Sequence, residues 1–294
     1  MSYPSGPQWG VPYTLTGPDG AIAVFNDDTS PYYVGVLSPE SSGLDSADVR
    51  ESASDQVEAD GGIHGNFYYG RRPLILQGTI LANSSTQRNE RIARLKRASN
   101  AMRDDSVLTF TPDGGLESFL KLRRQQPLRI TKGWMKEFQL PMVAADPRIY
   151  GTTLTTVSAE AGGAPSAGRS YDKAFDFSYG AALSVGQIFI TNNGDAESPP
   201  VVKVYGPGVN PAIYNATTDE TIALTYSLAA GEYLEIDLLS RTVLLNGVTN
   251  RYSAVDFAST HWWMLQPDQN DIRLGYFSFE AGAKFEISYR DAWI

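Results

Sequence analysis

Long helical periodicity is scarce in this chain, and that scarcity limits the folds open to it more than any other feature. Short apolar runs recur instead, and turn-forming segments separate them: GPDG at 17–20, PDGG at 112–115 and NG at 246–247. Short runs bounded by glycine, proline, asparagine and aspartate are typical of strands and hairpins. The sequence therefore predicts a mainly β protein.

One amphipathic helix interrupts this pattern. It follows an aliphatic, strand-like run at 71–81 and a segment, NSST at 83–86, whose side-chain oxygens can cap a helix. The apolar stripe of this helix recurs at intervals of three and four residues: Ile92, Leu95, Ser99 and Met102. We predict that this stripe covers a sheet, which makes the N-terminal half an α+β domain with one flanking helix.

Charge is divided unevenly along the chain. Residues 1–60 hold ten acids and one base, residues 61–136 hold fourteen bases and five acids, and residues 137–294 hold eighteen acids and nine bases. The three segments therefore carry net charges of −9, +9 and −9. Such surfaces can pair within one chain or between identical subunits, and the sequence leaves both open. Nucleic-acid binding is a third alternative, but the basic helix lacks the interleaved aromatic residues or the motif that would make it specific.

Small residues mark a predicted boundary between two domains. The segment AEAGGAPSAG at 159–168 has few side chains that would stabilise a core, as expected of a linker. We predict an N-terminal domain at 1–150, a Gly/Ala-rich linker at 151–168 and a C-terminal domain at 169–294. In the C-terminal domain, short strand-like runs, among them 187–191, 201–205, 233–237 and 262–265, alternate with turns and predict a β-sandwich.

Residues suited to catalysis or metal binding are few. The chain has no cysteine, so disulfides, zinc–thiolate sites and thiol catalysis are excluded. His64 and His261 lie far apart and outside an HExxH motif. The segment DQND at 268–271 has oxygen ligands for calcium but lacks the glycine and glutamate of an EF-hand loop. We expect no enzymatic activity, no cofactor and no metal site.

The sequence does not show the pattern of a membrane-spanning segment or of a signal peptide. No run of about 18 apolar residues occurs, and the polar first residues do not have signal-peptide architecture. We therefore expect no membrane insertion and assembly in a cytoplasm.

Four segments of the N-terminal half follow one another in a distinctive order. The turn DGG at 60–62 precedes YGRR at 69–72 and the strand LILQG at 74–78; the basic helix follows, and a later strand ends in VAADPRIY at 143–150. In order and spacing they resemble the N-terminal domain of the distal tail proteins of long, flexible-tailed (siphovirus-type) bacteriophages.

The C-terminal half extends this resemblance. It holds NNGD at 192–195 leading to SPP at 198–200, GP at 206–207, AGEYLEID at 230–237 and WWMLQP at 262–267. These segments resemble the C-terminal domain of the same family, so that residues 12–294 are covered. The family commonly has Pro-Gly where this chain has Pro267-Asp268, which concerns the local turn.

The resemblance implies a structural protein of the virion tail tip. Such proteins form a hexameric ring, in which a tail-tube-like N-terminal β-sandwich continues the tube and a galectin-like β-sandwich points outward as a docking domain. The implied partners are further copies of the chain, the tail tube protein, a tail-tip hub or tail-associated lysin, and a receptor-binding protein, while DNA only passes through the lumen. Assembly would take place in the host bacterial cytoplasm.

Within such a ring, the charge division predicts which side chains meet a neighbouring subunit. We predict contacts from Arg71, Arg72, Arg91 and Arg94 to acids of the next copy. Arg91 and Arg94 are expected to lie off the apolar stripe, where reversing their charge would cost little folding stability.

Carbohydrate binding for host-surface recognition is the main alternative function, because Trp262, Trp263, Tyr276 and Phe277 could stack on sugars. Adjacent Trp262 and Trp263 on a strand would point to opposite faces, so at least one belongs in the core. A cell-wall hydrolase is a further class, but no pair of carboxylates is singled out for glycoside hydrolysis.

Overall fold

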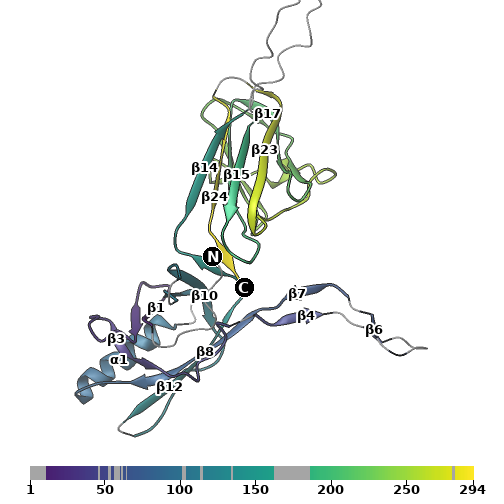
Figure 1. Cartoon of the computed structure of the whole chain (residues 1–294). Helices are drawn as coiled ribbons and strands as arrows, with labels where there is room; N and C mark the ends of the chain where they lie inside the picture. The colour runs from purple at the N-terminus through teal and green to yellow at the C-terminus, as the bar shows by residue number, and fades with distance from the viewer. Residues whose placement is uncertain are drawn as a thin grey trace, which may run out of the picture. The chain divides into compact units, whose positions relative to one another are not determined.

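The computed structural model describes residues 11–45, 47–51, 54–55, 60, 62–63, 65–100, 104–112, 115–133, 135–161, 186–279 and 282–294. The chain divides into two compact units (Figure 1). The N-terminal unit contains the residues up to Thr152 together with Trp293 and Ile294, and the C-terminal unit runs from Thr153 to Ala292.

A ten-stranded sheet forms the N-terminal unit. Its strands lie in the order β11 (Arg129–Ile130), β12 (Lys136–Ala144), β8 (Arg72–Ile80), β3 (Tyr33–Leu37), β2 (Ile22–Phe25), β1 (Tyr13–Thr16), β9 (Ser106–Phe110), β10 (Ser118–Arg124), β13 (Ile149–Gly151) and β25 (Ala292–Trp293). β10 also pairs with β12, through Arg123 opposite Val143 and Arg124 opposite Met142. Because of this extra pairing, the sheet curls round and closes on itself.

The enclosed face of this sheet holds the core of the N-terminal unit. Buried and less buried residues alternate along β8 and β12, as the two-residue period of a strand requires. Phe25 and Phe138 stack there, with ring centroids 5.6 Å apart. Trp293, close to the end of the chain, is also part of this core.

Helix α1 (Ser85–Ala98) begins at a cap that the sequence predicts. The Ser84 side chain accepts a hydrogen bond from the Gln87 backbone N–H at 3.1 Å, and the Gln87 side chain in turn accepts one from the Asn83 backbone N–H at 2.8 Å. Leu95, Ala98 and Ser99 are buried, and Ile92 packs against the core. The predicted stripe is therefore confirmed for these residues, while Met102 lies outside the described residues.

A two-stranded arm extends from the sheet between β3 and β8 (Figure 1). β4 (Val49–Glu51) pairs with β7 (Phe67–Tyr69), and β5 (Ser54–Asp55) pairs with β6 (Gly62–Ile63). We call the ribbon of β4 and β7, together with the adjoining Asp45, Ala47 and Asp48, "the arm".

Two facing sheets build the C-terminal unit. The first has the order β14 (Thr155–Glu160), β24 (Lys284–Tyr289), β16 (Val201–Tyr205), β20 (Tyr233–Asp237), β21 (Thr242–Leu245) and β22 (Thr249–Asn250). The second has the order β15 (Gln187–Asn192), β23 (Asp268–Phe279), β17 (Gly208–Asn215) and β18 (Glu220–Ala223), with β19 (Ser227–Leu228) beside β17. A short 3-10 helix spans Tyr252–Ala254. One apolar core, which includes Trp263 and Phe285, draws on both sheets.

The mainly β prediction, with one helix against the N-terminal sheet and a C-terminal sandwich, is confirmed. Two local predictions differ from the structure. Residues 155–160, within the predicted linker, form β14 and pair along their whole length with β24. Residues 262–265, predicted as a strand, are irregular apart from one bridge between Leu265 and Ser198. Asn270 holds this segment, because its side chain bonds to the Gln266 backbone N–H and carbonyl.

Candidate assembly surfaces

Arg91 and Arg94 attach helix α1 to the start of β3. The Arg91 guanidinium donates to the Leu81 carbonyl and lies over the Tyr33 ring, 4.8 Å from its centroid. The Arg94 guanidinium donates to the Pro31 carbonyl at 2.9 Å and lies 5.6 Å from the Tyr32 ring centroid. Both side chains are half-buried. Because both guanidinium groups already hold contacts within their own chain, reversing their charge is expected to cost more folding stability than the sequence suggested, and their contact with a neighbouring subunit stays a prediction.

Arg71 and Arg72 have opposite environments. Arg71 is exposed, but Arg72 is completely buried and donates to the carbonyls of Pro147, Gly43 and Leu44 at 2.7, 3.1 and 3.0 Å. It ties the β3–β4 connection and the segment after β12 to β8. This corrects its prediction as an interface residue, because a side chain enclosed by its own chain cannot contact a neighbouring subunit.

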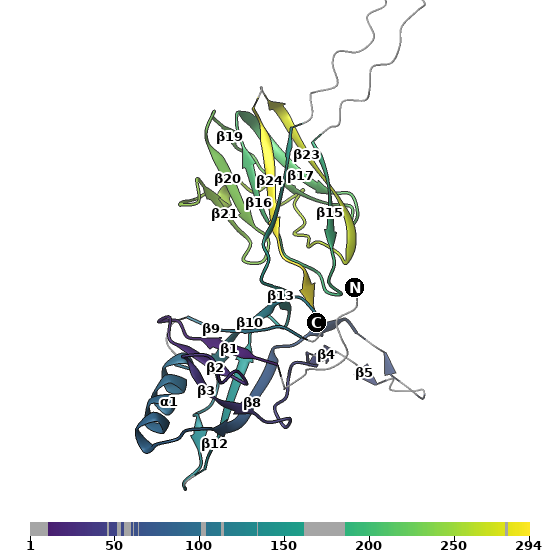
Figure 2. The same cartoon turned by 60° about the vertical axis from the view of Figure 1, so that its left-hand side comes forward.

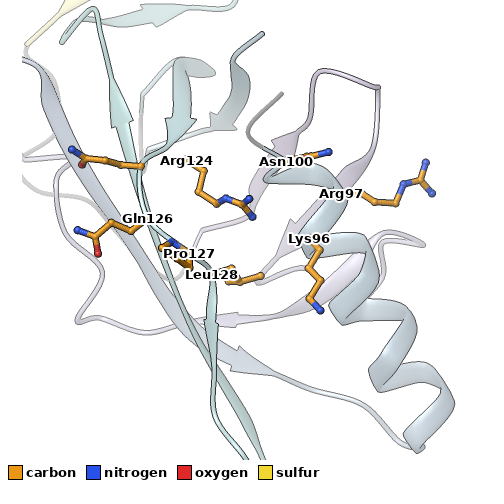
Figure 3. Close-up of a pocket in the computed structure, with 8 residues that line it drawn as sticks. Lys96, Arg97, Asn100, Arg124, Gln126, Pro127 and Leu128 are labelled. Atoms are coloured by element: carbon orange, nitrogen blue, oxygen red, sulfur yellow. The ribbon is translucent and has the colours of Figure 1, made fainter. Parts of the chain in front are cut away.

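A basic hollow of about 690 Å³ lies between the C-terminal end of α1 and the segment from β10 to β11 (Figure 3). We call it "the hollow", and the residues that line it are Lys96, Arg97, Asn100, Arg124, Gln125, Gln126, Pro127 and Leu128. Figure 3 shows Arg124 and Leu128 directed toward the helix, whereas the Arg97 guanidinium points away. No acid lines the hollow, and within the described part of the chain neither Lys96 nor Arg124 has an ion-pair partner.

The arm is exposed on both faces. All three residues of β4 and all three of β7 are exposed. The large apolar and aromatic side chains among them have high exposed fractions: 59% for Val49, 56% for Phe67, 62% for Tyr68 and 53% for Tyr69. Asp45 and Asp48, next to β4, are exposed as well. The sequence did not identify these aromatic residues as a surface.

The aromatic residues predicted as possible sugar contacts do not form one surface. Trp263 is buried in the core of the C-terminal unit. The Tyr276 ring packs against that core, and its hydroxyl donates to the Tyr205 carbonyl at 2.7 Å. Burial also raises the pKa of the Tyr276 hydroxyl, which stays a neutral donor. Trp262 is half-exposed, as is Tyr276, and the position of the Phe277 side chain is outside what the structure describes.

Trp262 has aromatic neighbours that the sequence did not indicate. Its ring stacks on Tyr252 at a centroid distance of 6.5 Å and an angle of 10°, and Tyr252 meets Phe257 edge-on at 5.4 Å. Tyr252 and Phe257 keep exposed fractions of 38% and 61%. The three rings form a small exposed aromatic patch on the C-terminal unit.

Asp268 occupies the position where the resembling family commonly has glycine. Its backbone adopts φ +68°, the left-handed region that glycine enters most easily and aspartate tolerates. Aspartate therefore adopts at this position a backbone conformation that glycine can also adopt. The neighbouring Asp271 forms an ion pair with Arg273 at 2.5 Å and accepts a hydrogen bond from the Gln187 side chain. The Asp271 carboxylate is therefore engaged by side chains of the β15–β23 strand pair.

Within the described ranges, no group of three or more histidine, cysteine, aspartate or glutamate side chains could hold a metal ion. In the same residues, no helix is long and apolar enough to cross a membrane.

Three comparisons with known proteins bear on the identity of the chain. Residues 193–293 match the family described as siphovirus-type tail component, C-terminal domain. No curated protein matches the chain by sequence. The crystal structure of SPP1 Dit, described as a paradigm of the hub adsorption apparatus in phages that infect Gram-positive bacteria, superposes with a TM-score of 0.65. The two chains are 12% identical, and the alignment covers 96% of this chain and 99% of that one.

Two structures of the phage p2 baseplate in its activated conformation, with strontium and with calcium, are more distant. Both have a TM-score of 0.49, with 13% and 12% identity, and they cover 95% of this chain and 98% and 97% of theirs. The assignment therefore rests on the family match and on SPP1 Dit. The predicted resemblance to siphovirus distal tail proteins is confirmed: residues 193–293 are a siphovirus-type tail component C-terminal domain, and the whole chain has the fold of a siphovirus Dit protein.

Proposed function

We propose that this chain is a structural component of a phage tail tip and assembles into a hexameric ring. The observation that carries the proposal is the Dit fold over 96% of the chain, together with the tail-component family match in its C-terminal unit. In this ring the N-terminal units continue the tail tube toward the baseplate or tail-tip hub. The C-terminal units provide outward docking sites.

The partners follow from this position. They are the other copies of the chain, the tail tube protein, a tail-tip hub or tail-associated lysin, and a receptor-binding protein, with DNA passing through the lumen. The protein would be assembled in the host cytoplasm and carried in the virion. Its mechanism is geometric, because a ring would keep the tail lumen continuous and would present docking surfaces to neighbouring proteins.

Electron microscopy of the purified full chain tests this proposal. Negatively stained particles are expected to be rings with sixfold symmetry and an open centre. Particles without a ring in both the purified protein and assembled tails would contradict it. Turnover of peptidoglycan by the purified protein would favour a cell-wall hydrolase instead.

Carbohydrate binding remains a second candidate because of one observation, the exposed patch of Tyr252, Phe257 and Trp262. Aromatic faces of this kind can stack on sugar rings. A glycan array compares the wild-type chain with Trp262→Ala, and Phe189→Ala, another exposed aromatic of the same unit, is the matched control. Binding that only Trp262→Ala abolishes would support this function, and an array without binding would exclude it for the glycans tested.

A further inference from the structure

We infer that the arm of one copy docks onto the hollow of a second copy of the chain. This inference rests on the proposed ring and names the surfaces that would form its subunit contact. The occupant of the hollow is thus the β4–β7 ribbon of a neighbour, and both surfaces consist of described residues.

The first argument is that the arm is a surface that requires a partner. A two-stranded ribbon is marginally stable by itself in water, and stable ribbons pack against something else. Both faces of this ribbon are exposed, and Val49, Phe67, Tyr68 and Tyr69 make them apolar and aromatic. Contiguous apolar surface of this kind on a soluble protein marks an interaction site.

The second argument is that the charge and the apolar surface of the hollow complement those of the arm. Residues 45–60 contain six acids and one base, Arg50, whereas Lys96, Arg97 and Arg124 are the charged residues that line the hollow. Carboxylates next to β4 can pair with Lys96 and Arg124, and such pairs would fix the register of the two subunits. The Arg97 guanidinium points away from the hollow and lies 3.8 Å from Asp19 of its own chain. Pro127, Leu128 and the aliphatic stems of the cations offer apolar contact to the tyrosine and phenylalanine rings, and a cation over such a ring adds attraction.

The third argument is the position of the two surfaces, which excludes a contact between the arm and the hollow of the same chain and favours a ring. In both views the arm and helix α1 lie on opposite sides of the N-terminal unit (Figures 1 and 2). The arm of a chain therefore does not fold back onto its own hollow. Contacts between two different surfaces of identical subunits are head-to-tail, and they close into a ring when the rotation between neighbours permits it.

Cysteine cross-linking tests the contact directly, because the chain has no cysteine of its own. A chain with Tyr68→Cys is mixed with a chain with Gln126→Cys and oxidised, and a disulfide-linked dimer is expected. The double variant is expected to give a ladder of covalent oligomers. Tyr68→Cys mixed with Val248→Cys is the control, since Val248 is 84% exposed and lies in the C-terminal unit. Equal yields in both mixtures, or no cross-link in either, would overturn the inference.

Charge reversal gives a second, independent test. Lys96→Glu with Arg124→Glu, and separately Asp45→Lys with Asp48→Lys, are each expected to raise the dissociation constant of the ring at least about tenfold. Combining all four changes should restore association. Lys121→Glu with Lys132→Glu, exposed positions away from the hollow, is the matched control. Circular dichroism checks that every variant is folded.

The outcomes separate this inference from the proposed function. A wild-type chain that stays monomeric would contradict the ring itself and the inference with it. A wild-type ring that persists in both reversed pairs, without the cysteine cross-link, would overturn the arm–hollow contact and leave the ring proposal intact.

Discussion

At the scale of single residues, two consecutive arginines at the start of β8 illustrate how burial decides what a charge does. Arg72 donates three hydrogen bonds to backbone carbonyls and is enclosed, whereas Arg71 faces solvent. Hydrogen bonds from a charged donor are stronger than neutral ones, and buried carbonyls left without donors carry a desolvation cost.

Replacing each arginine by alanine is expected to separate these roles. Arg72→Ala should lower the free energy of unfolding by at least about 3 kcal/mol, because it leaves a void and takes this donor from three carbonyls, of which that of Leu44 is buried. Arg71→Ala, the matched control, should change it by less than about 0.5 kcal/mol. Urea unfolding of both full-length variants measures the difference. Equal and small effects would mean that Arg72 does not hold the two connections together.

Residue environments of this kind were the least predictable from the sequence. The segment YGRR supplies two identical cations, and nothing in the local pattern shows that strand alternation turns the second one inward. One of Trp262 and Trp263 was expected in the core, and Trp263 is buried, although the segment is irregular and not the strand on which that expectation rested. The aromatic partners of Trp262 were not predictable, since Tyr252 and Phe257 belong to a separate connection.

At the scale of secondary-structure elements, helix α1 is held by polar contacts as well as by its apolar stripe. Arg91→Ala and Arg94→Ala are each expected to destabilise the fold by about 1–2 kcal/mol, since each loses a charge-assisted hydrogen bond and a cation–π contact at a half-buried site. Arg97→Ala is the control. The Arg97 guanidinium is exposed, and an exposed ion pair such as the one with the Asp19 carboxylate, at 3.8 Å, contributes little to stability. Thermal unfolding of the three variants is compared. A shift for Arg97→Ala as large as for the others would refute this account.

The strand pair β16–β24 should give the C-terminal unit a pH-dependent stability. Glu286 accepts hydrogen bonds from Lys284 at 2.9 Å and from Tyr205 at 2.8 Å, and these lower the pKa of its carboxyl below the ordinary 4.5. Burial and the bond to Glu286 in turn raise the pKa of Tyr205 to about 12. Because the folded carboxyl has the lower pKa, its stabilisation is present above pH 4.5 and is lost as the pH falls through the folded pKa.

Glu286→Gln is therefore expected to unfold with a smaller dependence on pH than the wild type between about pH 5 and pH 3. Denaturant unfolding at a series of pH values measures the slope. Asp271→Asn serves for comparison. Asp271 lies in a different strand pair, and its hydrogen bond with Arg273 also lowers the pKa of its carboxyl. If Glu286→Gln kept the wild-type slope, the hydrogen bonds to Glu286 would not stabilise its charged form.

Elements with strong alternation were predictable, and those with weak or mixed composition were not. The β1–β2 and β9–β10 hairpins form as their turn sequences indicate. β14 was not predicted, because its small side chains have the composition of a linker, although Val157 and Ala159 pack against the core. β23 was not predicted, because its first half is mostly charged and polar, although Ile272 and Leu274 are buried in the core. The order of segments, and not any single strand, indicated the family.

At the scale of the whole molecule, the end of the chain completes the core of the first unit. Trp293→Ala is expected to destabilise the N-terminal unit by about 3–5 kcal/mol, because it removes a buried aromatic side chain. Hydrogen exchange measured by mass spectrometry should show faster exchange in peptides from β8 and β12. Trp262→Ala, in the other unit, is the control and should leave those peptides unchanged. Unchanged exchange in Trp293→Ala would contradict a shared core.

We propose that identical copies of this chain close into a ring, and the division of charge along the sequence supports this proposal. The acidic first segment supplies β4 and the carboxylates next to it, and the basic second segment supplies β7 and the hollow. Exposed ion pairs are screened by salt, so a contact of this kind weakens as ionic strength rises.

The most direct test is the mass of the purified full chain in solution, measured at increasing protein concentration and at low and high salt. We predict a species of six times the chain mass of 32.1 kDa, which grows with concentration and declines with salt. A single species of 32.1 kDa at every concentration would contradict the account.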